Sequence, residues 1–144
     1  MLYLAIDQHK NQMTINIRNE HGDVIQKGHV STNPTDIDGF FAAFVKKARQ
    51  HRGSMAIVEV CGFNDWLLAK LQQTRCSEIV VIQPDSTAVN KTDKRDANAL
   101  GGLLIRLHHL PINYRKDRYE IIIFQYSQRV EDNHAEPREY GEDE

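Results

Sequence analysis

Long apolar runs, paired cysteines and a large excess of one charge are all missing from this 144-residue sequence, whose net charge is −2. No apolar stretch approaches the ~20 residues that a membrane-spanning helix needs, so the sequence predicts no such helix. The chain begins directly in a strand-like segment without a basic flank, and we expect a cytoplasmic protein without a signal peptide. The two cysteines, Cys61 and Cys76, lack metal-site spacing, and we expect reduced thiols rather than a disulfide.

Charge is distributed unevenly along the chain, which is long enough for one domain with a real core. Residues 1–114 contain 13 Lys/Arg and 11 Asp/Glu, whereas residues 115–144 contain 5 and 9. A body this close to neutral does not hold nucleic acid tightly through phosphate contacts alone. If the protein acts on nucleic acid, we expect another chain, a further domain or a metal ion to contribute affinity.

Apolar periodicity predicts an α/β domain that begins with a meander of three strands. Residues 13–17 alternate apolar and polar side chains, and residues 19–23 (NEHGD) have the composition of a turn. Helices then alternate with strands, which predicts a mixed five-stranded sheet with helices on both faces. The predicted strands are 2–6, 13–17, 24–30, 55–60 and 79–82. The predicted helices begin at Thr35 or Asp36, at Asn64 or Asp65 and at Thr92 or Asp93, and end before Gly53, at Leu71 and before Pro111. In the second helix, Trp66, Leu67 and Leu71 are expected to face inward.

The character of the chain changes after residue 112. Two interpretations stay open for the apolar part of this region: helical spacing predicts a helix over 117–130, whereas residues 121–124 (IIIF) have strong strand propensity. Residues 131–144 are acidic and poor in apolar side chains, and we expect them to be disordered. We therefore divide the chain into a body, residues 1–112, and a divergent tail, residues 113–144.

Four carboxylates occupy positions that an α/β sheet would bring to one edge. Asp7 and Glu59 end two apolar strands, and the carboxyl ends of adjacent parallel strands meet at the same edge of a sheet. Asp93 and Asp96 are three residues apart at the predicted start of the helix that follows the last strand, so they share one face of that helix. Acids that converge in this way repel one another unless a cation binds among them.

The donor atoms of these four residues indicate which metal would bind. Carboxylate oxygens are hard ligands, and with neither thiolate nor paired imidazoles among them they favour Mg²⁺ or Mn²⁺. Two such ions about 3.5–4 Å apart would stabilise the entering and leaving oxygens of an in-line displacement at phosphorus. The four acids therefore predict a metal-dependent phosphodiester enzyme.

Basic residues beside the acids are candidates for nucleic-acid binding. His9 and Lys10 follow the first strand and either contact a scissile phosphate or belong to a solvated turn. Lys91, Lys94 and Arg95 lie close to the later acids in the sequence. They either grip a nucleic-acid backbone or offset the negative charge of the acids.

Four segments together resemble a known family: YLAIDQHK, VEVCGFNDWLLAKL, VVIQPDSTAVNKTDKRDANAL and LLIRLHHLP. They are similar to the N-terminal catalytic domain of DEDD transposases, an insertion-sequence family related to pilin-gene-inverting site-specific recombinases. The resemblance covers residues 2–112, and the stretch K-T-D-x-x-D-A-x-x-L is its most specific part. It implies an RNase H-like, RuvC-type fold, with Asp7, Glu59, Asp93 and Asp96 as the catalytic, metal-binding acids.

The family's activity implies DNA strand cleavage and rejoining during transposition or inversion, and one branch of the family uses a structured guide RNA. Full-length members also carry a C-terminal domain with a serine thought to attack DNA. This sequence changes after Pro111, and Ser127 is the only serine that follows. We therefore expect the recombinase activity to be incomplete without that second domain.

Two other functional classes compete with this interpretation. One is a non-catalytic, truncated remnant that binds nucleic acid or a transposase partner. The other is an actin-like or sugar-kinase-like phosphate binder, which is disfavoured because residues 8–10 (QHK) lack the Gly and hydroxyl residues of a phosphate-cradling loop. For assembly, the apolar stretch 119–130 is expected to pack against a second copy, giving a dimer, or against a full-length transposase chain.

Overall fold

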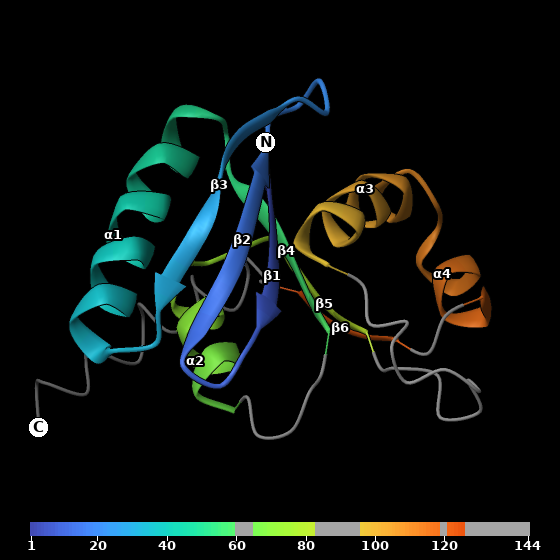
Figure 1. Ribbon diagram of the computed structural model, residues 1–144. Helices are drawn as coiled ribbons and strands as arrows, with labels where there is room; N and C mark the ends of the chain where they lie inside the picture. Colours follow the sequence, from blue (N-terminus) through green and yellow to red (C-terminus); the bar gives the residue numbers. More distant parts are fainter. Residues whose placement is uncertain (60–64, 83–95, 119–120, 126–144) are drawn as a thin grey trace, which may run out of the picture.

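A six-stranded mixed sheet forms the centre of the computed structural model, with helices on both of its faces (Figure 1). The structure describes residues 1–59, 65–82, 96–118 and 121–125. The strands are β1 (Leu2–Gln8), β2 (Gln12–Arg18), β3 (Val24–Ser31), β4 (Ser54–Glu59), β5 (Glu78–Ile82) and β6 (Ile121–Gln125). The helices are α1 (Pro34–Gln50), α2 (Asp65–Gln73), α3 (Ala97–His108) and α4 (Ile112–Arg118). Of these described helices, none combines the length and apolar character that crossing a membrane requires.

The strands lie side by side in the order β3-β2-β1-β4-β5-β6. β1, β2 and β3 form the predicted antiparallel meander, β4 and β5 run parallel to β1, and β6 returns antiparallel to β5. The order and directions of β1 to β5 are those of an RNase H-like fold, which confirms the predicted fold class. β1 lies between β2 and β4, and all of its residues are buried.

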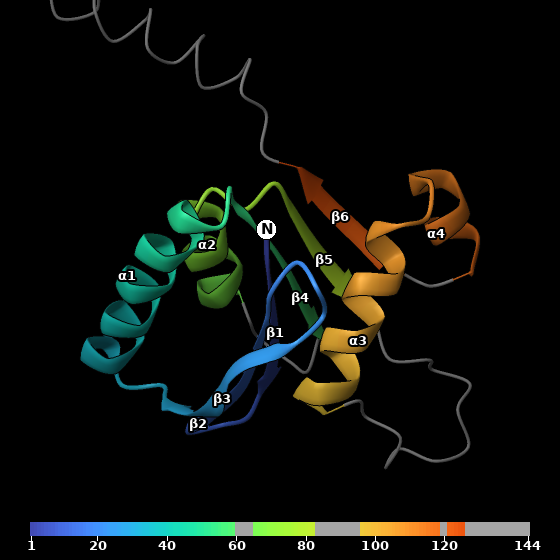
Figure 2. The same ribbon diagram turned by 90° about the horizontal axis from the view of Figure 1, so that it is seen from above.

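Alternation along the strands divides the core into two layers, one on each face of the sheet. Leu4 and Ile6 of β1 belong to the layer beneath α1 and α2, whereas Tyr3 and Ala5 belong to the layer beneath α3. Figure 2 shows α1 and α2 on one side of the sheet and α3 and α4 on the other. Burial stabilises each large apolar side chain by about 1.5–3 kcal/mol, so the alternation fixes which side chains reach which face.

Asn33 caps α1. Its side-chain oxygen accepts a hydrogen bond of 2.9 Å from the Thr35 backbone N–H. The prediction of Thr35 or Asp36 as the cap is wrong, because Pro34 takes the first helical position, where a missing N–H costs nothing. The helix ends before Gly53, as predicted, and the φ of 111° at Gly53 suits a glycine.

α2 keeps Leu67 and Leu71 in the core, as predicted. Trp66, however, is 37% exposed, which corrects the expectation that it faces inward. Successive residues of a helix are rotated by about 100° around its axis. Because Leu67 and Leu71 face the core, Trp66 lies to one side of the buried face and is partly exposed.

α3 begins later than predicted. Its first residue is Ala97 rather than Thr92 or Asp93, and Asp96 before it has extended backbone angles. The Asp96 side chain accepts a hydrogen bond of 2.8 Å from the Ala99 backbone N–H, which makes Asp96 the N-cap of the helix.

β6 replaces the helix predicted over residues 117–130. Residues Ile121–Gln125 pair antiparallel with β5, so that helix is wrong and the sheet has six strands rather than five. The run is rich in β-branched residues, and Ile121 and Ile123 pack against the core layer beneath α3. Residues 126–144, and with them the predicted acidic disorder, lie outside the described residues. The division of the chain at residue 112 stays a prediction.

Candidate metal centre

Asp7 and Glu59 lie next to each other on neighbouring strands. β1 and β4 pair in parallel register up to Ile6 opposite Val58, and the two acids are the next residue of each strand. Paired strands are about 4.8 Å apart, so the backbones that carry these carboxylates are close. The prediction that two parallel strands bring Asp7 and Glu59 to the same edge is confirmed by this register.

Strand alternation directs both carboxylates to the face that α3 covers. Asp7 comes two residues after Ala5, and Glu59 two residues after Ile57, and these apolar residues belong to the core layer beneath α3. Asp7 is 7% exposed and Glu59 is 2% exposed. Two buried carboxylates in one row repel each other, and a cation bound between them would offset that repulsion.

The hairpin after β1 brings His9 to Asp7. His9 Nε2 lies 3.2 Å from Asp7 Oδ2, and the His9 backbone N–H donates a 2.8 Å hydrogen bond to the Gln12 carbonyl, which fixes the turn. Lys10 is exposed in the same turn. Of the two predicted nucleic-acid contacts in this hairpin, His9 therefore lies at the acid pair and Lys10 at the surface. Their contact with a phosphate stays a prediction.

Asp96 is not brought into a metal site with Asp7 and Glu59. Its exposed side chain caps α3, and within residues 1–59, 65–82, 96–118 and 121–125 no three His, Cys, Asp or Glu side chains are grouped to hold a metal. Asp93 lies outside the described residues, and so do three of the predicted nucleic-acid contacts, Lys91, Lys94 and Arg95. Of the three predicted acids that the structure describes, Asp7 and Glu59 lie together and Asp96 lies apart.

The residues that are present fit a divalent cation in part. Asp7 and Glu59 offer hard carboxylate oxygens from two adjacent, buried strands, which hold their ligands rigidly. Mg²⁺ and Mn²⁺ need further oxygen ligands, and water or additional carboxylates normally provide them. The pair therefore forms one side of a possible site rather than a complete one.

α3 is held over this face by polar contacts that the sequence prediction missed. Arg18 Nη2 donates to the Asn98 carbonyl at 3.1 Å and to Asn98 Oδ1 at 3.0 Å, and Arg18 Nε donates to Asn16 Oδ1 at 3.2 Å. Gly101 permits the close approach, since a Cβ there would lie 2.6 Å from Asn16 Oδ1 and 2.9 Å from Arg18 Nε. A glycine inside a helical pattern is the sequence signal that indicates such packing. These contacts fix the first turn of α3, just after Asp96.

The opposite end of α3 is attached to the start of β1. The Tyr3 hydroxyl and His108 Nδ1 share a hydrogen bond of 2.8 Å, and their ring centroids are 5.6 Å apart. Burial, and then the charge of His109, lowers the pKa of His108, while burial raises the pKa of Tyr3. α3 is therefore fixed at both ends, which sets where its first turn lies relative to the acid pair.

Comparison with known proteins gives little beyond this geometry. No protein family and no curated protein matches the sequence. Two solved structures of Thermus thermophilus RuvC, one of them in complex with a Holliday junction substrate, are similar with a TM-score of 0.41 and 13% identity. Each match covers 58% of this chain, and it spans 65% and 64% of the two RuvC chains. The fold assignment therefore comes from the strand order and directions.

Proposed function

We propose that this chain is a metal-dependent domain that cleaves phosphodiester bonds, with Asp7 and Glu59 as two of its metal ligands. The observation that carries the proposal is the burial of two carboxylates in one row of the sheet, on adjacent parallel strands. A buried pair of this kind is costly for stability alone, and a cation bound between them would offset the cost.

More specifically, we propose a DNA transposase or site-specific recombinase domain that cleaves and rejoins DNA strands with Mg²⁺ or Mn²⁺. The support is the K-T-D-x-x-D-A-x-x-L stretch, which resembles DEDD transposases and supplies Asp93 and Asp96 as the remaining acids. Asp96 uses Oδ1 in the α3 cap, which leaves Oδ2 for a metal. A structured guide RNA and a C-terminal serine domain are the further components that the resemblance implies.

Each candidate site residue has its own role in this proposal. Asp7 and Glu59 would hold the ion from the sheet. Asp93 and Asp96, which the family resemblance adds, would complete its ligands, although the described structure does not group Asp96 with the other two. A bound divalent ion supplies charge neutralisation at the reacting phosphate. His9, 3.2 Å from Asp7, would contact the same phosphate. The nucleic-acid backbone would be bound by four further cations, which are Lys10, Lys91, Lys94 and Arg95.

A cleavage assay tests the proposal. We expect the chain to nick supercoiled plasmid DNA in the presence of Mn²⁺, and Glu59→Gln to lose at least 100-fold in rate, as removal of a key electrostatic group does. Asp36→Asn, an exposed acid on α1, serves as the matched control and should retain the rate. If nicking persists in Glu59→Gln, the activity does not belong to this site.

A non-catalytic binding domain is the second candidate, favoured by the use of Asp96 as a helix cap. It predicts that the chain binds DNA or a full-length transposase chain without metal and never nicks DNA. Filter binding with EDTA, run beside the nicking assay, separates the two candidates. Binding that survives EDTA, without nicking in Mn²⁺, supports the second candidate.

We also propose that the chain forms a dimer or joins a full-length transposase chain through β6. Ile122 is 46% exposed and Phe124 is 37% exposed, and both lie on the same side of this edge strand. Exposed apolar side chains on an edge strand favour pairing with another chain.

A further inference from the structure

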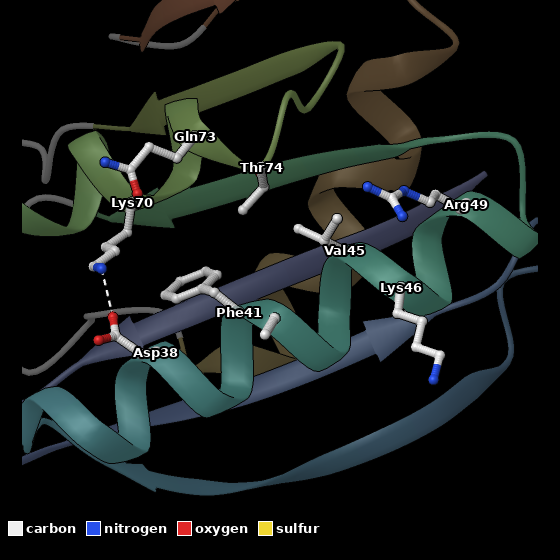
Figure 3. Close-up of a pocket in the computed structure, with 9 residues that line it drawn as sticks. Asp38, Phe41, Val45, Lys46, Arg49, Lys70, Gln73 and Thr74 are labelled. Atoms are coloured by element: carbon white, nitrogen blue, oxygen red, sulfur yellow. Dashed lines mark hydrogen bonds and ion pairs between the residues drawn. The ribbon is translucent and has the colours of Figure 1, made fainter.

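α1 and α2 form a groove on the side of the sheet opposite the acid pair. Its volume is about 490 Å³, and Figure 3 shows its lining side chains. Phe41, Ala42 and Val45 give it an apolar lining along α1, and Gln73 and Thr74 close the side formed by the end of α2. The groove therefore suits a chain segment that brings both apolar and polar side chains.

The charges of this groove are unbalanced. Lys70 on α2 is paired with Asp38 on α1, as the dashed line in Figure 3 marks. Lys46 and Arg49 also line the groove, and in the described part of the chain neither of them forms an ion pair. Two cations thus stay uncompensated beside an apolar lining, which favours a negatively charged occupant.

The acidic segment of this chain, residues 126–144, has the matching charge. It contains seven Asp or Glu residues and two Arg residues, together with apolar side chains at Tyr126, Val130 and Tyr140. The groove offers a net positive charge and apolar area, so the segment is complementary to it in both respects.

Gln125 is the last described residue before the acidic segment, and its side-chain Nε2 donates a hydrogen bond of 3.1 Å to Glu78 Oε2 at the start of β5. Thr74, which lines the groove, lies four residues before Glu78 in the sequence. The 19 residues of the segment can extend roughly 60 Å, more than twice the ~25 Å length of a 17-residue helix such as α1.

We propose that the acidic segment, residues 126–144, binds in the α1–α2 groove of its own chain, with carboxylates against Lys46 and Arg49. This contact is independent of the metal centre, because the groove and the acid pair lie on opposite faces of the sheet. In this position the acidic segment pairs with Lys46 and Arg49 and prevents these two residues from binding nucleic acid or a partner chain.

Carbodiimide cross-linking of the full chain, freed of nucleic acid with nuclease, tests the contact directly. The reagent joins a lysine amine to a touching carboxylate. We expect Lys46 to be joined to an Asp or Glu of residues 131–144 in the band of monomer mass, and Lys70 to be joined to Asp38 as an internal positive control. Cross-links from Lys46 found only at dimer mass would mean that the segment of a second copy fills the groove, which overturns the proposal.

Trypsin provides the second readout, because the acidic segment contains Arg129 and Arg138. In low salt, the double variant Lys46→Glu/Arg49→Glu should be cut at these two sites at least fivefold faster than wild type. The matched control Arg106→Glu/Lys116→Glu, which changes exposed cations of α3 and α4, should match wild type.

Equal cleavage of all three proteins overturns the proposal. Equal cleavage together with loss of DNA binding in the Lys46→Glu/Arg49→Glu variant alone would assign the groove to nucleic acid instead. A circular dichroism melt of each variant confirms that the comparison is made on folded protein, and this test does not depend on metal binding or on DNA cleavage.

Discussion

Asp7 and Glu59 follow directly after a paired row of β1 and β4, and both carboxylates are buried beneath α3. Like charges that lie close together in a low-dielectric environment repel each other, and a cation bound between these two carboxylates would offset that repulsion. In a domain selected for stability alone, the same row would be apolar, as Ala5 and Ile57 are two residues earlier. The row is therefore where the proposed cation would bind.

Removing one of these charges should leave the fold intact. Glu59→Gln relieves the repulsion and keeps the size of the side chain, so we expect a melting temperature equal to wild type or higher in EDTA. Differential scanning calorimetry measures this, with Asp36→Asn as a surface control. A strong destabilisation of Glu59→Gln would instead identify Glu59 as a structural anchor.

The close approach of α3 to β2 should make Gly101 intolerant of any side chain. Gly101→Ala would place a Cβ 2.6 Å from Asn16 Oδ1, and we expect a loss of about 1–2 kcal/mol in the free energy of unfolding, since overpacking outweighs the gain in helix propensity. Gly102→Ala is the matched control: its nearest contact, Arg106 Nη1, is 3.5 Å away, and we expect a gain of up to about 1 kcal/mol. Urea denaturation of both variants measures the difference, and equal effects would contradict the close contact.

The Tyr3–His108 contact predicts a dependence of stability on pH. The pKa of His108 is lowered in the folded protein, chiefly by burial, so the unfolded chain takes up a proton first as the pH falls. The stability contributed by His108 is therefore complete above its unfolded pKa, about 6.5, and is lost as the pH falls through the lower folded pKa. Melting temperatures between pH 7.5 and 5 measure this loss.

His108→Gln separates this effect from the other histidines. The other histidines, among them His9 beside Asp7 and His51 beside Glu20, are present in both proteins, so their contribution is common to the two curves. We expect the melting temperature of wild type to fall more steeply than that of His108→Gln. Parallel curves would show that His108 has no depressed pKa.

Much of the fold follows from patterns that the sequence displays openly. The meander from β1 to β3 was predictable because β1 is an apolar run, β2 alternates apolar and polar residues, and the turn after β2 contains Asn and Gly. The parallel pairing of β1 with β4 followed from the helix between them. From that pairing, the proximity of Asp7 and Glu59 followed as well. Periodicity failed at Ile121–Gln125, where a short apolar run fits a helix and a strand equally, and pairing with β5 decides the outcome.

Two other features of the site, the role of Asp96 and the contacts of Arg18, could not be predicted from the sequence. Asp96 is a good metal ligand and a good helix cap, and spacing alone does not distinguish these roles. The contacts of Arg18 to Asn98 and Asn16 join residues that are far apart or on one strand, so only the packed structure reveals them.

The edge strand β6 should mediate assembly. Ile122→Lys together with Phe124→Lys places charges on the exposed apolar side of β6, and we expect a wild-type dimer to become a monomer. The matched control is Gln125→Lys, an exposed polar position on the same strand, which should stay dimeric. Multi-angle light scattering measures the masses, and a wild-type monomer would remove this interface.

The central claim is that Asp7 and Glu59 hold a divalent cation, and isothermal titration of Mn²⁺ into the full chain tests it most directly. We predict a saturable heat for wild type and for Asp36→Asn, and its loss in both Asp7→Asn and Glu59→Gln, measured with and without a DNA duplex. The absence of any binding heat in wild type under both conditions, or an unchanged heat in the two site variants, would contradict the account.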